Sequence, residues 1–428
     1  MEREGRMGRT RASGRVLLVL LVLLSGYVSA GTRAEGAGAG RGPLTLATAG
    51  DLTGYLGPLL ARWNRAHPAE KVTLVELPDS ADETREQMET DLRGAGGGRF
   101  DVLNIDVGWT SRFAAAGWVR PLSRERFPLD GFLPPVVDTA TYEGRLYAVP
   151  YVTNAGLLLY RKDVLARAGL SAPRTWAELE RAAATVAPEY GLDGYAGQLL
   201  PYEGLTVNTA EAVYSAGGTL LDDDGGRVTA DSPAAREGIA FLARGVREGW
   251  IPRAALSYTE EESKRAFEDG HLLFLRNWPY AYVAADSPGS AVAGDVGVVR
   301  LPGPDGPGTS VLGGSNLAVA AHARHPDSAQ RLIAYLTSTP VQRRVLTQGA
   351  LPPVRAALYE DPGLVRRFPY LPVLRDAVLS AAPRPKSPRY DQVSLVVQAV
   401  AQDALTGRLS PDAAVRRLAA ELAAVAER

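Results

Sequence analysis

The chain has 428 residues, of which 46% are hydrophobic and 22% are charged. This length is sufficient for two hydrophobic cores, because a single core stops growing at about 250–300 residues. The formal net charge is −1, so we expect neither a nucleic acid nor an anionic membrane surface as a partner. Cysteine is absent, which excludes disulfides, thiolate metal sites and cysteine nucleophiles.

Residues 1–30 have the pattern of a signal peptide. Five arginines precede an unbroken apolar run from Val16 to Leu24, which is too short to span a bilayer. Small residues at 28–30 offer a cleavage point, and retention of the segment as a membrane anchor is the alternative. The glycine-rich residues 31–42 that follow are expected to form a flexible linker.

The signal segment also contains part of a lipid-attachment pattern. Leu24-Ser25-Gly26 resembles the start of a bacterial lipoprotein box, but Tyr27 stands where the lipidated cysteine would be. A tyrosine cannot form the lipid thioether, so we expect no lipid anchor there. The protein is therefore expected outside the cytoplasm, either secreted or associated with the cell surface.

From residue 43 onward, short apolar runs typical of strands alternate with helical patterns, which predicts a parallel α/β sheet. Strands are expected at 44–47, 72–77 and 101–105. Asp51 is expected to cap a helix whose apolar face continues through Trp63. Beyond residue 150 helical patterns dominate, and serine-proline pairs at 232–233 and 410–411 predict two of the helix starts.

Catalytic and metal-binding patterns are scarce. The four histidines have no metal-ligand spacing, and no G-x-S-x-G or H-E-x-x-H motif occurs. Asp222 to Gly226 (DDDGG) is typical of a hairpin turn, whereas the alternative, a calcium loop, lacks its other ligands. A facing pair of carboxylates for glycoside hydrolysis stays open as an alternative. We expect a protein that is not an enzyme, with no catalytic residue, no metal and no cofactor.

Side chains suited to ligand binding instead occur where predicted strands end. Asp106 directly follows the strand at 101–105, and ligands of open α/β sheets bind at such strand ends; a helix N-cap is the alternative. Asn154 lies in an apolar segment, where a buried amide needs a partner such as a ligand hydroxyl. Trp278 precedes Pro279, and its indole could cover the apolar face of a sugar ring unless it belongs to the core.

A family resemblance follows from five ordered segments. These are DVLNIDVGWTSRFAAAGWVRPL (101–122), LYAVPYVTNAGLLLYRKDVL (146–165), YEGL (202–205), RNWPYAY (276–282) and LGGSNLAVA (312–320). They resemble segments of the bacterial extracellular solute-binding proteins of family 1, in particular those of its trehalose/maltose-binding branch. The resemblance covers roughly residues 43–428.

The resemblance implies a two-lobed periplasmic-binding-protein-like α/β fold with a hinge and a ligand cleft between the lobes. We expect residues 43–151 with 311–357 in the N-terminal lobe and residues 152–310 with 358–428 in the C-terminal lobe. The implied function is capture of a sugar, a disaccharide or small oligosaccharide, by hinge closure. The expected partners are this carbohydrate and the membrane permease subunits of an ABC importer, with the chain itself a monomer. A sensor in place of the importer is the alternative.

The resemblance also implies particular ligand-binding residues. Asp106 resembles the family's sugar-binding acid, and Asn154 stands where relatives carry Asp or Asn. Trp278 resembles the stacking tryptophan, and Arg384, within the sequence PRP, resembles the ligand-binding arginine.

Four further positions match the family pattern in part. Gly314, in the GG turn, resembles a backbone contact, and Arg85 lies in a helical segment that supplies a basic contact. Ser315 stands where trehalose/maltose binders often have a second tryptophan. The N-terminal glutamate contact is not matched, and Asp51 is the nearest acid that could replace it. These departures favour a sugar ligand in general over trehalose in particular.

Overall fold

The computed structural model describes residues 40–427 apart from 51–53, 95–97 and 223–224. The predicted signal peptide, Tyr27 and residues 31–39 of the predicted linker lie outside the described residues. Within the described ranges, no helix is long and apolar enough to cross a membrane. The same part of the chain contains no group of His, Cys, Asp or Glu that could hold a metal ion.

The first sheet has the strand order β2-β1-β3-β11-β6. Its strands are β1 (Leu44–Ala49), β2 (Val72–Leu77), β3 (Val102–Asp106), β6 (Ala148–Ala155) and β11 (Leu312–Val319). β1 is parallel to β2 and β3, but β11 is antiparallel to both β3 and β6. The prediction of a parallel sheet is therefore wrong for β11. The chain returns to this sheet from the second sheet, so β11 enters between β3 and β6 from the opposite end.

Helices cover this sheet through their apolar faces. They are α1 (Leu56–Ala66), α2 (Ala81–Arg93), α3 (Thr110–Ala115), α4 (Pro134–Thr139), α12 (Pro326–Leu336) and α13 (Thr339–Gly349), and a short hairpin of β4 (Thr141–Tyr142) and β5 (Arg145–Leu146) lies beside α3 and α4.

α1 begins at Leu56, and Tyr55 rather than Asp51 is its N-cap residue. The predicted cap is wrong because Gly54, with φ +67°, has left-handed backbone that interrupts any helix reaching back to Asp51. Asp51 itself lies outside the described residues.

The second sheet has the strand order β10-β7-β9-β8. Its strands are β7 (Leu157–Arg161), β8 (Asp193–Ala196), β9 (Leu272–Asn277) and β10 (Val296–Arg300). β7 is antiparallel to β9 and β10, while β8 and β9 are parallel. Every residue of β9 is buried, so this central strand is held in place by packing on both faces, and Trp278 follows it directly.

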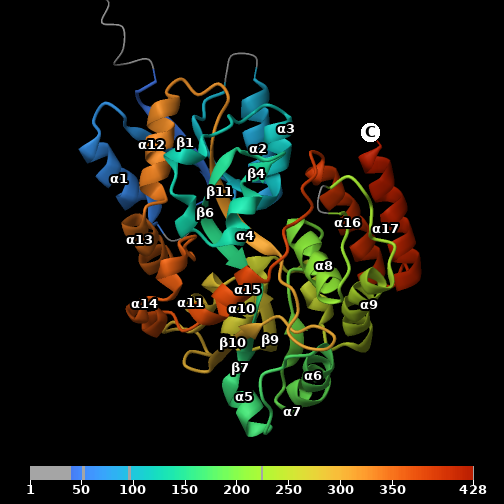
Figure 1. Cartoon of the computed structure of the whole chain (residues 1–428). Coiled ribbons are helices and arrows are strands. Elements are labelled where there is room, and N and C mark those ends of the chain that lie inside the picture. Colours follow the sequence, from blue (N-terminus) through green and yellow to red (C-terminus); the bar gives the residue numbers. More distant parts are fainter. Residues whose placement is uncertain (1–39, 51–53, 95–97, 223–224, 428) are drawn as a thin grey trace, which may run out of the picture. The chain divides into compact units, whose positions relative to one another are not determined.

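The remaining helices belong to two groups. Those between residues 162 and 285 are α5 (Lys162–Arg167), α6 (Trp176–Arg181), α7 (Ala187–Glu189), α8 (Glu203–Ser215), α9 (Pro233–Glu248), α10 (Glu260–Glu268) and α11 (Tyr280–Ala285). The C-terminal group is α14 (Pro362–Arg367), α15 (Leu371–Leu379), α16 (Tyr390–Leu405) and α17 (Pro411–Ala426). α16 packs on α8 and α9, and α17 packs on α9 (Figure 1). Their shared apolar cluster includes Val213, Ile239, Val397 and Leu418.

The two helix starts predicted from serine-proline pairs and the predicted hairpin turn are confirmed. Ser232 and Ser410 accept hydrogen bonds from the backbone N–H groups of Ala235 and Ala413, at the starts of α9 and α17. Near the DDDGG segment, Leu221 pairs with Val228 in an antiparallel bridge, as expected of a hairpin. Residues 223–224 of this turn lie outside the described residues.

Two crossings of the chain join the sheets, and side-chain contacts tie them together. The first crossing is Gly156, between β6 and β7, and the second ends at Val311, just before β11. The Ser310 hydroxyl donates to the Gly156 carbonyl over 2.6 Å, and the Val311 N–H donates to Glu211 Oε1 over 3.2 Å. Glu211 in turn forms a buried ion pair of 2.6 Å with Arg276. The second crossing is therefore bonded to the ion pair of Glu211, on α8, and Arg276, on β9 of the second sheet, and Ser310 bonds it to the first crossing.

Candidate functional site

Strand β11 brings four of the predicted ligand-binding residues to one level of the first sheet. In its register, Ser315 lies opposite Asp106 on β3 and opposite Val152 on β6. Gly314 lies opposite Thr153, and Gly313 lies opposite Asn154. Asp106, Asn154, Gly314 and Ser315 thus lie on three adjacent strands at the point where β3 ends.

The two glycines of the GG turn permit close packing at this level. Gly314 has φ +110°, and a Cβ atom there would lie 2.1 Å from the Val152 carbonyl oxygen. A Cβ atom on Gly313 would lie 2.8 Å from Cζ3 of Trp278 and 3.4 Å from Cβ of Asn154. Because Gly313 and Gly314 have no side chains, Trp278, which follows a strand of the second sheet, can reach the backbone of β11 beside Asn154.

The indole of Trp278 is held at three points. Its backbone N–H donates to Asn277 Oδ1 over 2.7 Å, and its Nε1–H donates to Glu260 Oε1 over 3.3 Å. The Arg276 guanidinium lies 4.2 Å from the ring centroid, which is a cation–π distance. Trp278 is half-buried, so it is not a fully enclosed core residue.

Arg384 is the most enclosed of the predicted site residues, with a side chain only 3% exposed. It forms ion pairs with Asp106, at the end of β3, and with Glu203, at the start of α8, the latter over 2.6 Å. Burial alone would lower the pKa of Arg384, but the charges of Asp106 and Glu203 and the contact with Tyr390 raise it well above its ordinary value. Arg384 is therefore a fixed cation at this position.

Glu203 accepts hydrogen bonds from the hydroxyls of Tyr390 and Ser394 as well as from Arg384. Burial raises the pKa of Glu203, whereas Arg384 and the two hydroxyl donors oppose that rise. Asp106 also accepts the backbone N–H of Gly108 over 2.7 Å, so the cap considered for Asp106 as the alternative role is present. Its side chain is 25% exposed, which leaves part of the carboxylate open to a ligand.

One donor of Arg384 is unused. Its buried Nε–H has no hydrogen-bond acceptor among the described residues. It faces the backbone at Gly108, because a Cβ atom there would lie 3.3 Å from this nitrogen. A small pocket here is lined by the loop after β3, including Val107, Gly108 and Ser111, and by Pro383 to Lys386. A buried donor without an acceptor is costly, and this pocket, with a volume of about 10 Å³, has room for a single acceptor oxygen.

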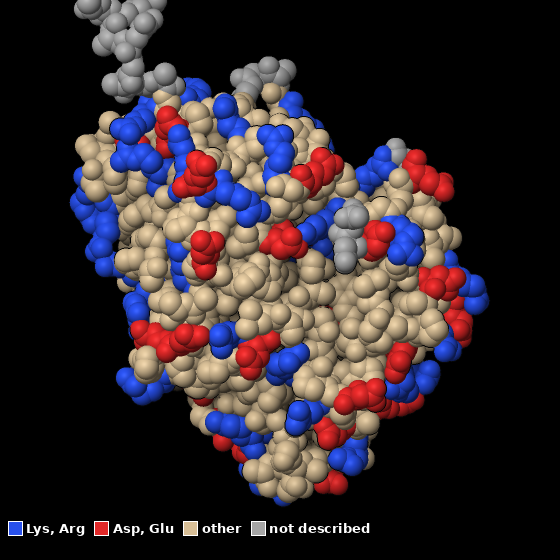
Figure 2. Space-filling model, in the orientation of Figure 1, with Lys and Arg blue, Asp and Glu red and all other residues tan. Residues whose placement is uncertain are grey.

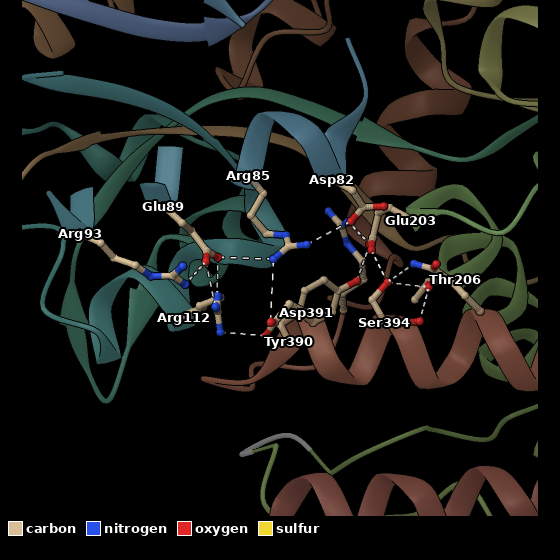
Figure 3. A network of polar contacts seen from close by, with 12 residues as sticks. Asp82, Arg85, Glu89, Arg93, Arg112, Glu203, Thr206, Tyr390, Asp391 and Ser394 are labelled. Carbon is tan, nitrogen blue, oxygen red and sulfur yellow. Dashed lines mark hydrogen bonds and ion pairs between the residues drawn. The ribbon is translucent and has the colours of Figure 1, made fainter. Parts of the chain in front are cut away.

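Arg85 lies outside this group but is connected to it (Figure 3). Its guanidinium is 3.4 Å from Asp82 and Glu89 and 3.9 Å from Asp391. Asp391 directly follows Tyr390, which donates to Glu203. The structure thus brings together Asp106, Asn154, Gly314, Ser315, Trp278 and Arg384, and places Arg85 at the edge of the same polar network.

Several polar residues of this region had not been singled out from the sequence. Glu203 is the acid of the YEGL segment, and its position within that motif was the available signal. Glu260 follows Thr259, which is the N-cap residue of α10. Its sequence pattern therefore indicates a helix start, and nothing in the sequence indicates that Glu260 accepts a hydrogen bond from Trp278. Arg276 and Glu211 are 65 residues apart, and their pairing is visible only in the fold.

This arrangement, two sheets joined by paired crossings with polar groups at the strand ends, is that of the two-lobed binding proteins. The described fold matches that of the maltose-bound T. maritima MalE3 with a TM-score of 0.83 and 34% sequence identity, over 90% of this chain and 99% of that chain. The predicted fold class is thereby confirmed.

The chain belongs to the bacterial extracellular solute-binding protein family, whose sequence pattern matches residues 49–343. A probable ABC transporter-binding protein of Deinococcus radiodurans is 33% identical over 366 residues, which are 83% of this chain and 86% of that protein. A mannitol-binding protein of Pseudomonas aeruginosa is 26% identical over 82% of this chain and 86% of its own length. The family resemblance seen in the sequence is confirmed.

Proposed function

We propose that the chain captures a disaccharide or small oligosaccharide outside the cytoplasm and delivers it to the permease subunits of an ABC importer. The observation that carries this proposal is the buried Arg384, whose Nε–H lacks an acceptor among the described residues while its other nitrogens bind Asp106 and Glu203. A sugar hydroxyl can accept from the guanidinium and donate to the Asp106 carboxylate, and both bonds are charge-assisted. Trp278 supplies an aromatic face for a sugar ring.

Capture proceeds by closure of two lobes, residues 43–151 with 311–357 and residues 152–310 with 358–428. The support for this division is that the first sheet draws its strands from residues 44–155 and 312–319, whereas the second draws them from 157–300. Because β6 continues to Ala155, the sheets favour a first boundary at Gly156 rather than at residue 152. Asp106 belongs to the first lobe, and Trp278 and Arg384 belong to the second. A ligand that contacts all three residues therefore stabilises the closed arrangement and shifts the population toward it.

Two of the similar proteins point to different kinds of ligand. The maltose-bound T. maritima protein favours a disaccharide, and the mannitol-binding protein of Pseudomonas aeruginosa favours a linear polyol. We favour the sugar because a flat indole face matches a pyranose ring better than a flexible chain. Asn154 and Ser315 contribute neutral hydrogen bonds, and Gly314 contributes its backbone. Arg85 adds a charged contact at the edge of the site. Asp51, which lies outside the described residues, is proposed to replace the family's glutamate.

A ligand screen tests this function directly. Melting temperatures measured with maltose, trehalose and mannitol should rise for a sugar, by an amount equivalent to about 2.7 kcal/mol when the ligand is present at one hundred times its Kd. Mass spectrometry should recover the bound sugar intact, since the protein binds without catalysis. A shift with mannitol alone would identify a polyol-binding protein. Shortened sugars in the recovered ligand would identify an enzyme instead.

The N-terminal segment directs export without a lipid at position 27. Tyr27 stands at the position of the lipoprotein-box cysteine and has no thiol. When the chain is expressed in a bacterium with lipoprotein processing, a palmitate analogue should leave the natural protein unlabelled and should label the Tyr27→Cys variant. An unlabelled variant would show that Leu24-Ser25-Gly26 is ordinary signal-peptide composition.

A further inference from the structure

A second set of charges, separate from Trp278 and Arg384, links helices beside the first sheet to the C-terminal helix α16. Arg112, on α3, donates from Nε and Nη2 to the two carboxylate oxygens of Glu89, on α2, over 2.5 and 2.9 Å. Its Nη1 donates to Asp391, in the first turn of α16, over 2.8 Å. One guanidinium thus joins α2 and α3, beside the first sheet, to a helix that packs on α8 and α9 (Figure 3).

Glu89 holds Arg112 in position. Its side chain is only 4% exposed and also pairs with Arg93 over 2.5 Å. Burial by itself would raise the pKa of Glu89, but the hydrogen bond from Arg112 and the charges of Arg112, Arg85 and Arg93 lower it below its ordinary value. The two-point contact with a fixed carboxylate leaves the third nitrogen of Arg112 directed at Asp391.

Asp391 is a favourable partner on the other side. It lies in the first turn of the sixteen-residue helix α16, where the helix dipole stabilises a negative charge. The side chains of Arg112 and Asp391 are 15% and 18% exposed, so solvent screens their attraction less than it screens a surface pair.

Other ion pairs converge on the same short segment of the chain. Between residues 384 and 391, Arg384 pairs with Asp106 and Lys386 pairs with Asp138 on α4, the latter over 2.6 Å. Figure 2 shows acidic and basic side chains side by side where the chain near α4 approaches α16. The segment 384–391 is therefore where the proposed lobes are held together by charge.

We propose that Arg112 and Asp391, with Glu89 as the residue that orients Arg112, form an inter-lobe latch that sets ligand affinity without touching the ligand. This inference rests on the proposed capture by lobe closure. The latch stabilises the arrangement in which the lobes are together. The apparent Kd is the intrinsic Kd divided by the fraction of molecules in the binding-competent state, so loss of the latch weakens binding. Arg112 is a positioning residue in this scheme.

The latch also explains how Arg85 is kept available. Its contacts with Asp82, Glu89 and Asp391 are all between 3.4 and 3.9 Å, which is long for a charged hydrogen bond. Arg112 takes the short contacts with Glu89 and Asp391 and so neutralises the carboxylates that would otherwise hold Arg85 more tightly. Arg85 is therefore left loosely bound next to the site.

The absence of cysteine makes the latch directly measurable. Nitroxide labels can be attached to Glu86→Cys on α2 and Arg416→Cys on α17, two exposed positions on the two sides of the latch. Pulsed electron resonance then measures the distance between the labels in the full chain without ligand. We expect one short distance in the parent chain and an added longer distance in Arg112→Gln, in Asp391→Asn and in the double variant.

The matched control is Arg244→Gln, because Arg244 on α9 makes an equivalent two-point contact with Glu180 on α6, over 3.1 and 2.7 Å, and both helices lie on the same side of the latch. This control should leave the distances unchanged. Unchanged distances in the latch variants, or an equal change in the control, would overturn the latch.

Affinity supplies the second readout, with maltose as the probe. Each single variant should raise the Kd about three- to tenfold, and the double variant should raise it no further than the weaker-binding single variant. If the parent chain binds no sugar, the proposed function fails, while the label distances still decide whether the latch exists. If the parent binds maltose and the variants lose only thermal stability, the function stands and the latch is wrong.

Discussion

Arg384→Met is expected to lower the free energy of unfolding of the ligand-free protein by about 3–5 kcal/mol, the range for removing one partner of a buried ion pair. The guanidinium is 3% exposed and compensates the buried carboxylate of Glu203, while methionine fills much of its volume without charge. Glu203 would keep only the hydroxyl donors Tyr390 and Ser394. Urea unfolding measures the loss, and the same variant should lose most of its sugar binding.

Two controls separate this effect from the loss of any arginine. Arg417 also pairs with two carboxylates, Asp403 and Glu421, but its side chain is 39% exposed, so Arg417→Met should cost about 1 kcal/mol or less. The double variant Arg384→Met with Glu203→Gln should recover part of the stability, because no buried charge then lacks a partner. Equal costs at Arg384 and Arg417 would contradict the role given to Arg384.

Trp278→Ala is expected to weaken maltose binding by about 2–4 kcal/mol, or roughly 30- to 1000-fold in Kd, as for truncation of a central aromatic anchor. The indole is half-buried, and Arg276 covers one of its faces while Glu260 accepts its N–H. The exposed part can therefore be covered by a ligand. Isothermal titration measures the affinity, and thermal unfolding measures the stability of the same variant.

Trp176→Ala is the matched control, since Trp176 is buried and stacks on Phe241 with ring centroids 4.3 Å apart. This variant should lose about 3–5 kcal/mol of stability and, while folded, should bind maltose like the parent. The opposite result at Trp278, a much lower melting temperature with unchanged affinity, would show that Trp278 is a packing residue.

Elements with a clear local pattern could be predicted from the sequence, and the direction of β11 could not. The strands β1, β2 and β3 follow from short apolar runs, and the starts of α9 and α17 follow from serine-proline pairs that have a local physical cause. A strand pattern contains no information on direction, however. The position of β11 between β3 and β6 depends on a return from the second sheet, more than 150 residues after β6 began.

The site residues, too, could be predicted from the sequence only in part. Asp106 could be proposed because it stands at the end of a predicted strand, Trp278 because it precedes Pro279, and Arg384 because its segment matches the family. The network around Glu89 could not be proposed, because Arg112 and Asp391 are 279 residues apart and each resembles a charged residue on a solvated helix. Whether such a charge faces solvent or another charge depends on how the helices are packed.

The place of β11 also bears on the order in which the chain can fold. Until residues 312–319 have been synthesised, β3 and β6 each have one edge without its final partner. The first sheet therefore cannot be completed before the chain of the second sheet has been made, and unpaired strand edges invite wrong pairing. Contacts between residues so distant in sequence make folding slow, because loop closure has to precede the contacts that stabilise it. A nascent chain shorter than about 320 residues should accordingly remain incompletely folded, which prolongs the period in which an exported chain can still be threaded through a membrane channel.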